Sequence, residues 1–383
     1  MENNKTPSIR FKGFTDPWEQ RKLGEVFESL QNNTLSRAEL SVTQGNAKNV
    51  HYGDILVKYG EVLNIGEEQL PMIADDAVIS KFKSSFLQNG DVIVADTAED
   101  ETVGKCAEIA GLQGENVISG LHTIPYRPLF KFASGYLGYY MNSAAYHDQL
   151  LPLMQGIKVT SISKSAMQNT DIVYPKLVDE QKRIGECFRN LDRLITLHQR
   201  KYNKLLNVKK SMLEKMFPKN GSNIPEIRFK GFTDPWEQCK FSDVIDIGSG
   251  MDYKHLGEGN IPVYGTGGYM LSVNKALSYD KDAIGIGRKG TIDKPYILRA
   301  PFWTVDTLFY CIPKEHNNLD FINCIFQNVD WKKKDESTGV PSLSKVIINN
   351  VETAIPTFDE QQKIGAYFSE LNNLITLHQR LYF

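Results

Sequence analysis

The sequence predicts an α+β protein in which two α/β domains are joined by a pseudo-two-fold antiparallel coiled coil of two long helices. Two duplications support this fold class. The string IRFKGFTDPWEQ fills residues 9–20 and returns unchanged at residues 227–238, and the segment DEQKRIGECFRNLDRLITLHQRKY at residues 179–202 returns in similar form at residues 359–382. The stretches between the copies differ. One framework therefore occurs twice, around two different variable blocks.

The order of these segments predicts the domain organisation. Gly, Asn and Pro between the first long helix and the second framework string indicate a linker. In chain order we expect a first framework string at 1–20, a first variable domain at 21–176, a central helix at 177–217, a linker at 218–226, a second variable domain with the second framework string at 227–357, and a shortened C-terminal helix at 358–383.

The two copied helical segments carry a heptad pattern, with seam positions at alternating steps of four and three residues. The expected seam comprises Ile184, Phe188, Leu191, Ile195, His198, Tyr202 and Leu205 in the first helix, and Ile364, Phe368, Leu371, Ile375 and His378 in the second. An amphipathic helix does not bury such a seam alone, so we expect the two helices to pack on each other. The alternative is that each packs on its own domain. His198 and His378 either set the register or form a pH-sensitive pair.

Both variable blocks contain short strand-like apolar runs separated by turn signals, together with one short helix each, at 134–143 and 320–328. They are related to each other. The run Asp91-Val-Ile-Val-Ala95 aligns with Asp282-Ala-Ile-Gly-Ile286, and both blocks carry a Gly…Ser-Lys approach to the proline before the long helix. The blocks are therefore diverged copies of one unit.

Composition excludes several classes of protein. The net charge is −2, so overall charge does not indicate nucleic-acid binding. The five cysteines form no C-x-x-C pair and no histidines stand at metal-ligand spacing, so we expect no metal site. No apolar run approaches the roughly 20 residues that a membrane span needs, and the N-terminal residues MENNKTPSIR lack the apolar core of a signal peptide. We expect a cytoplasmic protein without membrane contact.

A search for catalytic motifs finds one formal match. Gly285-Ile-Gly-Arg-Lys-Gly290 fits G-x-G-x-x-G, but a proline-containing turn follows where a dinucleotide site requires a helix. A hairpin that exposes Arg288, Lys289 and Thr291 is the better interpretation. P-loop, zinc-protease and nucleophile-elbow motifs are absent, as is the Asn/Asp-Pro-Pro-Tyr/Phe string of adenine-N6 methyltransferases.

Basic, hydroxyl and aromatic side chains in both blocks suit contacts to phosphates and base edges. The candidates are Lys105, His122, Lys158, Thr160 and Ser161 in the first block, and Arg288, Lys289, Thr291, Arg299, Trp303, Ser342 and Lys345 in the second. Residues 180–217 also hold ten Lys/Arg against four Asp/Glu. This basic face either follows a phosphate backbone or is the solvated flank of a coiled coil.

The whole-chain pattern resembles the specificity (S) subunit of type I restriction-modification systems. The resemblance rests on the two IRFKGFTDPWEQ strings, the two DEQ…LITLHQR helices, the Gly…Ser-Lys…Pro approaches, and the run IGRKGT…PY…FWTVDTLFY, which looks like a target-recognition domain. It implies two target-recognition domains that each read half of a bipartite, asymmetric double-stranded DNA target. The conserved helices act as a spacer and dock the partner subunits.

The resemblance also implies the partners and cofactors. Two methyltransferase (M) subunits bind S-adenosylmethionine and methylate adenine N6, and restriction (R) subunits add ATP- and magnesium-dependent cleavage. The S subunit itself is non-catalytic and binds no cofactor. The second helix stops at Phe383, about 15 residues short of the pattern of the first, so the seam near residues 184–191 lacks a facing segment. Either an M subunit covers this exposed seam or the chain is truncated.

Two alternatives remain. A two-headed scaffold that binds proteins rather than DNA is consistent with the net charge of −2. An enzyme with an unrecognised site in one block is the other alternative.

Overall fold

The computed structural model describes residues 7–219 and 221–380. The chain divides into two compact units, Met1–Leu194 (unit 1) and Ile195–Phe383 (unit 2). The boundary falls inside the long helix α7 (Val178–Lys215), so the two halves of this helix belong to different units. Within the described ranges, no helix is long and apolar enough to cross a membrane.

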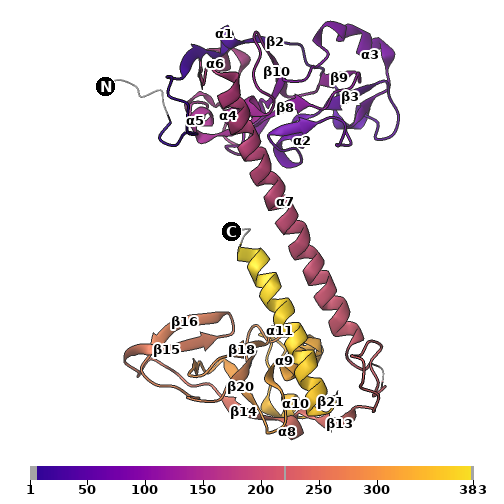
Figure 1. Cartoon of the computed structure of the whole chain (residues 1–383), viewed down its shortest axis with the longest axis vertical. Coiled ribbons are helices and arrows are strands. Elements are labelled where there is room, and N and C mark those ends of the chain that lie inside the picture. The colour runs from indigo at the N-terminus through magenta and orange to yellow at the C-terminus, as the bar shows by residue number, and fades with distance from the viewer. Residues whose placement is uncertain (1–6, 220, 381–383) are drawn as a thin grey trace. The chain divides into compact units, whose positions relative to one another are not determined.

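Unit 1 is built around a five-stranded sheet with the order β2-β10-β6-β8-β4, beside a three-stranded sheet β5-β3-β9 and the pairs β1-β12 and β11-β7 (Figure 1). Its strands are β1 (Glu19–Lys22), β2 (Phe27–Ser29), β3 (Ala47–Val50), β4 (Val62–Asn64), β5 (Met72–Ile73), β6 (Val92–Ala95), β7 (Thr97–Ala98), β8 (Cys106–Ala110), β9 (Val117–Ser119), β10 (Thr123–Pro128), β11 (Thr160–Ser161) and β12 (Asp171–Tyr174). Its helices before α7 are α1 (Leu23–Val26), α2 (Tyr52–Val57), α3 (Asp76–Lys81), α4 (Tyr136–Asn142), α5 (Ala144–His147) and α6 (Lys164–Gln168).

Unit 2 has a four-stranded sheet with the order β14-β20-β17-β18, a three-stranded sheet β16-β15-β19, and the pair β13-β21. Its strands are β13 (Glu237–Lys240), β14 (Ile245–Ser249), β15 (Glu258–Gly265), β16 (Gly268–Val273), β17 (Ala283–Gly287), β18 (Tyr296–Leu298), β19 (Trp303–Thr304), β20 (Leu308–Pro313) and β21 (Glu352–Ile355). Its helices after α7 are α8 (Phe241–Val244), α9 (Leu319–Asn328), α10 (Lys345–Asn349) and α11 (Phe358–Arg380).

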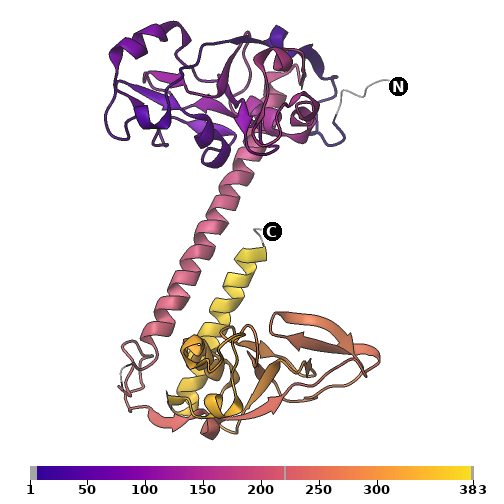
Figure 2. The ribbon, with the colours of Figure 1, turned by 180° about the vertical axis from the view of Figure 1, so that it is seen from behind.

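In unit 2, α11 lies antiparallel to the last part of α7 (Figures 1 and 2). Its seam side chains share one core with the end of α7, and Tyr202 and Leu205 pack against that core. The buried seam residues of α11 are Ile364, Phe368, Leu371, Ile375 and His378. The α+β class with two domains and two long helices is therefore confirmed.

The central strands β6 and β17 are buried along their whole length. Their uninterrupted apolar runs are typical of strands covered on both faces. The segment Gly285–Gly290 ends β17 and enters an antiparallel hairpin with β18, as predicted, and no helix follows it.

Strand pairing corrects the sequence alignment of the two blocks. β10 and β20 each end at a proline, opposite the first residue of β2 and of β14 respectively. Five residues before that proline lie Thr123 and Leu308, which pair with Ala95 and Gly287. Ala95 is therefore equivalent to Gly287, one position later than the sequence alignment placed it. A shift of one residue exchanges the two faces of a strand.

Candidate nucleic-acid interface

Each duplicated string is joined to its own long helix by a buried ion pair. In unit 1, Arg10 donates from Nε and Nη2 to the two carboxylate oxygens of Glu180, at 2.5 and 2.7 Å. In unit 2, Arg228 makes the same bidentate contact with Glu360, at 2.7 Å for both bonds. Both carboxylates are 1% exposed. Bidentate arginine–carboxylate pairs fix orientation as well as charge, so the string and the helix are held in one geometry in each unit.

The glutamine that follows the glutamate in each helix hydrogen-bonds to the backbone of the variable domain. The side chain of Gln181 accepts a hydrogen bond from Ala133 N at 2.9 Å and donates to Pro175 O at 2.8 Å. The side chain of Gln361 accepts from Asn318 N at 3.0 Å and donates to Pro356 O at 3.1 Å. These contacts connect each long helix to the segment that begins the short helix α4 or α9.

A glycine four residues further along each helix allows close packing. A Cβ at Gly185 would lie 3.3 Å from Ser134 O, and one at Gly365 would lie 2.4 Å from the side-chain oxygen of Asn318. The Arg–Glu pair, the glutamine and the glycine together form what we call the framework clamp. It explains physically why the strings and the DEQ…G segments are duplicated together.

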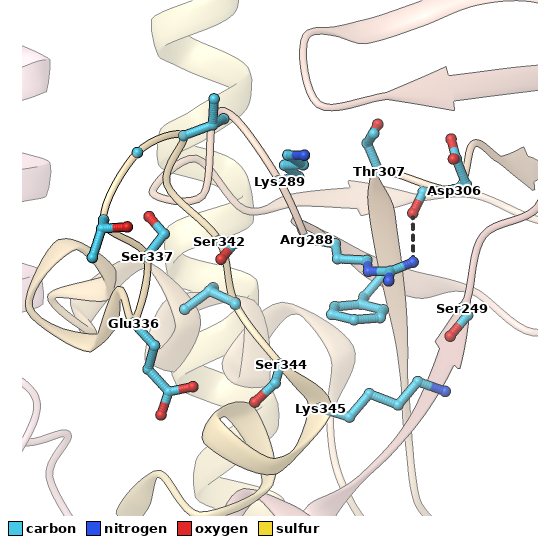
Figure 3. A pocket seen from close by; sticks show the side chains of 15 residues that line it. Ser249, Arg288, Lys289, Asp306, Thr307, Glu336, Ser337, Ser342, Ser344 and Lys345 are labelled. Atoms are coloured by element: carbon cyan, nitrogen blue, oxygen red, sulfur yellow. Dashed lines mark hydrogen bonds between the residues drawn. The ribbon is translucent and has the colours of Figure 1, made fainter.

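Unit 2 presents an open cleft of about 1050 Å³ beside the end of β17 (Figure 3). The residues lining it include Ser249, Arg288, Lys289, Asp306, Thr307, Phe309, Glu336, Ser342, Ser344 and Lys345. Three of its side chains are cationic, and Asp306 and Glu336 are its two acids. Hydroxyl and cationic donors dominate the polar lining, and this chemistry suits an anionic or hydrogen-bond-accepting ligand.

Two of the cations lie near the phenyl ring of Phe309. The Arg288 guanidinium and the Lys345 ammonium each lie 5.9 Å from its centre. Arg288 Nη1 donates to Asp306 O at 3.3 Å, and Lys345 Nζ donates to Ile247 O at 3.0 Å. Within the described residues, neither cation forms an ion pair with a carboxylate, so both keep their charge available to a ligand.

The equivalent site of unit 1 has different chemistry. Asp96 follows β6, and one of its carboxylate oxygens accepts the Thr97 hydroxyl at 2.8 Å and lies 3.4 Å from His122 Nδ1. His122 adopts a left-handed backbone with φ 54°, which is uncommon for a residue other than glycine. Its ring meets that of Tyr52 edge-on at 5.3 Å between centroids.

Backbone hydrogen bonds show that Asp96 and Arg288 occupy the same place in the two units. Asp96 N donates to His122 O, and Arg288 N donates to Thr307 O. In return, the carbonyl of Asp96 accepts from Ile162 N, and that of Arg288 accepts from Leu343 N. We call Asp96 and Arg288 the reading positions. Neither the composition nor the sequence alignment indicates Asp96. An alignment of β6 with β17 in the correct register would place Asp96 opposite Arg288.

Several candidate residues lie around these positions. In unit 1, Ser161 and Thr160 in β11 pair with Thr97 and Ala98 in β7. In unit 2, the backbones of Lys289 and Ser342 form an isolated antiparallel β-bridge. The structure therefore brings His122, Thr160 and Ser161 together in unit 1, and Arg288, Lys289, Ser342 and Lys345 together in unit 2.

Other candidate residues lie elsewhere. Lys105 is half-buried and donates to Leu56 O at 3.0 Å, and Lys158 lies in an exposed loop. Trp303 is buried, with its indole donating to Met251 O at 2.9 Å, so it packs inside unit 2 instead of offering a free aromatic face. Arg299 is paired with Asp282 at 2.6 Å. Thr291 is half-buried and does not line the cleft.

The two long helices differ in how their seams are covered. The ring of Phe217, two residues after α7, lies 5.7 Å from Trp236 and 6.2 Å from Phe368 in unit 2. In unit 1 the equivalent face borders an open groove of about 430 Å³, lined by residues including Ile9, Trp18, Ile184 and Phe188. Along the first half of α7, Ile184 is half-buried, whereas Phe188 and Leu191 are each 47% exposed. Ile195, the first residue of unit 2, is also 47% exposed.

The seam histidines meet inside unit 2. His198 Nδ1 lies 2.9 Å from His378 Nδ1. Burial, the charge of Lys201 and the neighbouring His198 lower the pKa of His378 below its ordinary value. Across the described chain, no cluster of three or more potential metal-ligating side chains occurs.

Comparison with known proteins decides the family. The family model for the type I restriction modification DNA specificity domain matches residues 15–207 and 233–382. This chain belongs to that family. Each match spans part of a framework string, one variable domain, and most or all of one long helix.

Individual relatives are distant but extend along the chain. The type I restriction enzyme MjaVIII specificity subunit of Methanocaldococcus jannaschii is 22% identical over 266 residues, which are 59% of this chain and 61% of that protein. This match thus spans less than two thirds of the relative. The putative type I restriction enzyme MjaX specificity subunit of the same organism is 23% identical over 397 residues, covering 95% of this chain and 89% of that protein.

A solved structure shares the fold. The crystal structure of a type I restriction-modification S subunit from M. genitalium matches with a TM-score of 0.60 at 14% identity, covering 99% of this chain and 97% of that chain.

Proposed function

We propose that this chain is the DNA-reading, non-catalytic specificity subunit of a type I restriction-modification complex. It recognises a bipartite, asymmetric target and directs adenine-N6 methylation and restriction by partner subunits. The observation that carries the proposal is internal to the molecule. One framework clamp is built twice, and it supports two units whose equivalent reading positions are Asp96 and Arg288. A target with two different half-sites requires two similarly held units whose reading positions carry different side chains.

The chemistry of the unit 2 cleft supports contact with DNA. Lys289 and Lys345 provide charge for phosphates, Arg288 adds a guanidinium for base-edge or phosphate acceptors, and Ser249 and Thr307 provide hydroxyl groups beside them. Side chains of these types make most protein contacts to DNA phosphates and base edges. The net charge of −2 does not oppose this proposal, because the cations gather locally.

We assign the chemistry to partner subunits. Two methyltransferase (M) subunits would carry S-adenosylmethionine, and restriction (R) subunits would use ATP and magnesium. The exposed apolar groove around Phe188 in unit 1 is suited to contact with another polypeptide.

An exchange of one block tests the proposal. Residues 21–176 are replaced by the corresponding block of a homologue, the chain is co-expressed with its M subunits, and methylated sites are mapped across a genome. We expect one half of the methylated sequence to change while the other half is kept. A change in both halves, or in neither, contradicts the proposal.

A protein-binding scaffold is the second candidate, and the net charge of −2 favours it. Duplex binding by the assembled complex distinguishes the two functions. A DNA reader loses affinity steeply as salt rises, because phosphate contacts release counterions. Salt-independent binding, or none, favours the scaffold. Methyl transfer or cleavage by the purified chain alone contradicts both functions.

A further inference from the structure

The two reading positions differ in the hydrogen bonds that they can make. Arg288 is a pure donor, and Asp96, when ionised, is a pure acceptor. The backbone of each makes the same two hydrogen bonds. Its N–H donates to the residue just before β10 or β20, and its carbonyl accepts from the segment just before α6 or α10. The difference between the sites therefore lies in the side chains and not in the path of the chain.

The contacts of Arg288 orient its side chain but leave most of its N–H donors without a hydrogen-bond partner among the described residues. Its guanidinium lies over Phe309 and uses Nη1 for the carbonyl of Asp306. The side chain is exposed at the cleft, and the remaining N–H groups form no other hydrogen bond within the described residues (Figure 3). A guanidinium has five N–H donors in a planar fork. In the major groove, that fork matches the O6 and N7 acceptors of guanine.

Asp96 is held in the complementary way. Oδ1 faces Thr97 and His122, while Oδ2 has no hydrogen-bond partner within the described residues. A free carboxylate oxygen accepts from the N4 amino group of cytosine in the major groove. It also repels the two acceptors of guanine, just as Arg288 repels an amino donor. Each side chain thus selects one base edge and disfavours the other.

We propose that Asp96 and Arg288 are the base-selecting residues of the two units, and that Arg288 selects guanine whereas Asp96 selects the amino group of cytosine. This inference rests on the proposed function. Lys289 and Lys345 beside Arg288 serve as phosphate contacts, since an ammonium is a point charge without the fork geometry.

The test uses the chain assembled with its M subunits and has two stages. First, methylated motifs are sequenced for the wild type, Arg288→Gln and Asp96→Asn. Each variant is expected to relax one base pair, and the two relaxed pairs are expected to lie in different halves of the motif. Lys294→Gln and Glu101→Gln are matched controls on exposed loop positions, and each is expected to leave the motif unchanged.

The second stage identifies the base edge on synthetic duplexes. Replacing guanine by 7-deazaguanine at the pair relaxed by Arg288→Gln is expected to weaken wild-type binding about tenfold or more, and to have little effect on the variant. N4-methylcytosine at the pair relaxed by Asp96→Asn is expected to act in the same way on the other half. Arg288→Lys keeps the charge but is expected to lose the preference, because lysine lacks the fork.

The outcomes separate the two proposals. A wild-type complex that methylates no specific sequence overturns the proposed function and the inference with it. A specific motif that stays unchanged in Arg288→Gln and Asp96→Asn overturns the inference alone. Equal tolerance of the base analogues by wild type and variants does the same.

Discussion

Phe188 and Phe368 occupy the same position in the two copies of the long-helix segment, yet they differ in exposure from 47% to 1%. Around both, the framework clamp is the same, with its Arg–Glu pair, glutamine and glycine. In unit 2 the segment just after α7 adds Phe217 over this face, and in unit 1 the face borders an open groove. The clamp is therefore built from short-range contacts that each copy carries for itself. Burial of the seam depends on a second helix.

The largest expected effect follows from this difference. Phe368→Ala removes a fully buried ring and should lower the free energy of unfolding by about 3–5 kcal/mol. Phe188→Ala removes the same side chain from a half-exposed site, where it stacks on Tyr139 at 5.4 Å, and should cost about 1 kcal/mol or less. Urea unfolding of the two variants measures both values. Equal losses would show that the two faces are covered alike.

The clamp itself is tested by removing one charge. Glu360→Ala leaves Arg228 buried without its partner and should destabilise unit 2 by about 3–5 kcal/mol. Glu370→Ala, on an exposed turn of the same helix, is the matched control and should change stability by less than about 0.5 kcal/mol. If both variants unfold at the same urea concentration, the ion pair does not hold the string to the helix.

The glycines sharpen the comparison of the two clamps. Gly365→Ala places a methyl group 2.4 Å from the side chain of Asn318 and 3.0 Å from Phe321 N, and should cost about 1–3 kcal/mol. Gly185→Ala meets atoms no closer than 3.3 Å, and the better helix propensity of alanine offsets part of the crowding. We expect it to be close to neutral in thermal unfolding. A larger loss at Gly185 than at Gly365 would reverse the expected order.

The smallest expected effect is on pH dependence. Because the pKa of His378 is lowered in the folded chain, the folded state binds fewer protons than the unfolded state when the pH is below the ordinary histidine pKa. Its stabilising contribution is complete above about pH 6.5 and is lost as the pH falls from there toward the folded pKa. His378→Gln should flatten this part of the curve of melting temperature against pH. An unchanged slope would mean that other groups titrate there.

The sequence predicted the elements well because they depend on local patterns. The apolar run at 91–95 contains β6 and the run at 283–286 lies within β17. The segment 134–143 contains α4, and the segment 320–328 forms all of α9 except its first residue. The heptad seam did not reveal where it is covered, because periodicity marks an apolar face but not its partner. The difference between Phe188 and Phe368 is therefore a tertiary effect.

The candidate site was predicted in part. Arg288 and Lys289 were found because a hairpin after a buried strand exposes them, and they do line the cleft. The sequence does not indicate Asp96, because the similarity of the two apolar runs places them one residue away from the register that the structure shows. Trp303 was chosen for its aromatic ring, but residue type alone does not distinguish a buried anchor from an exposed platform.

A chain with the same block in both frames tests directly whether the two copies of the frame hold interchangeable readers. Residues 239–357 are replaced by a second copy of residues 21–176, so that both framework strings and both long helices are retained. The chain is assembled with its M subunits, and the methylated motif is sequenced. We expect both half-sites to carry the sequence that the first block reads in the wild type. Methylation at a motif whose halves still differ would contradict the claim that one frame, built twice, holds interchangeable readers.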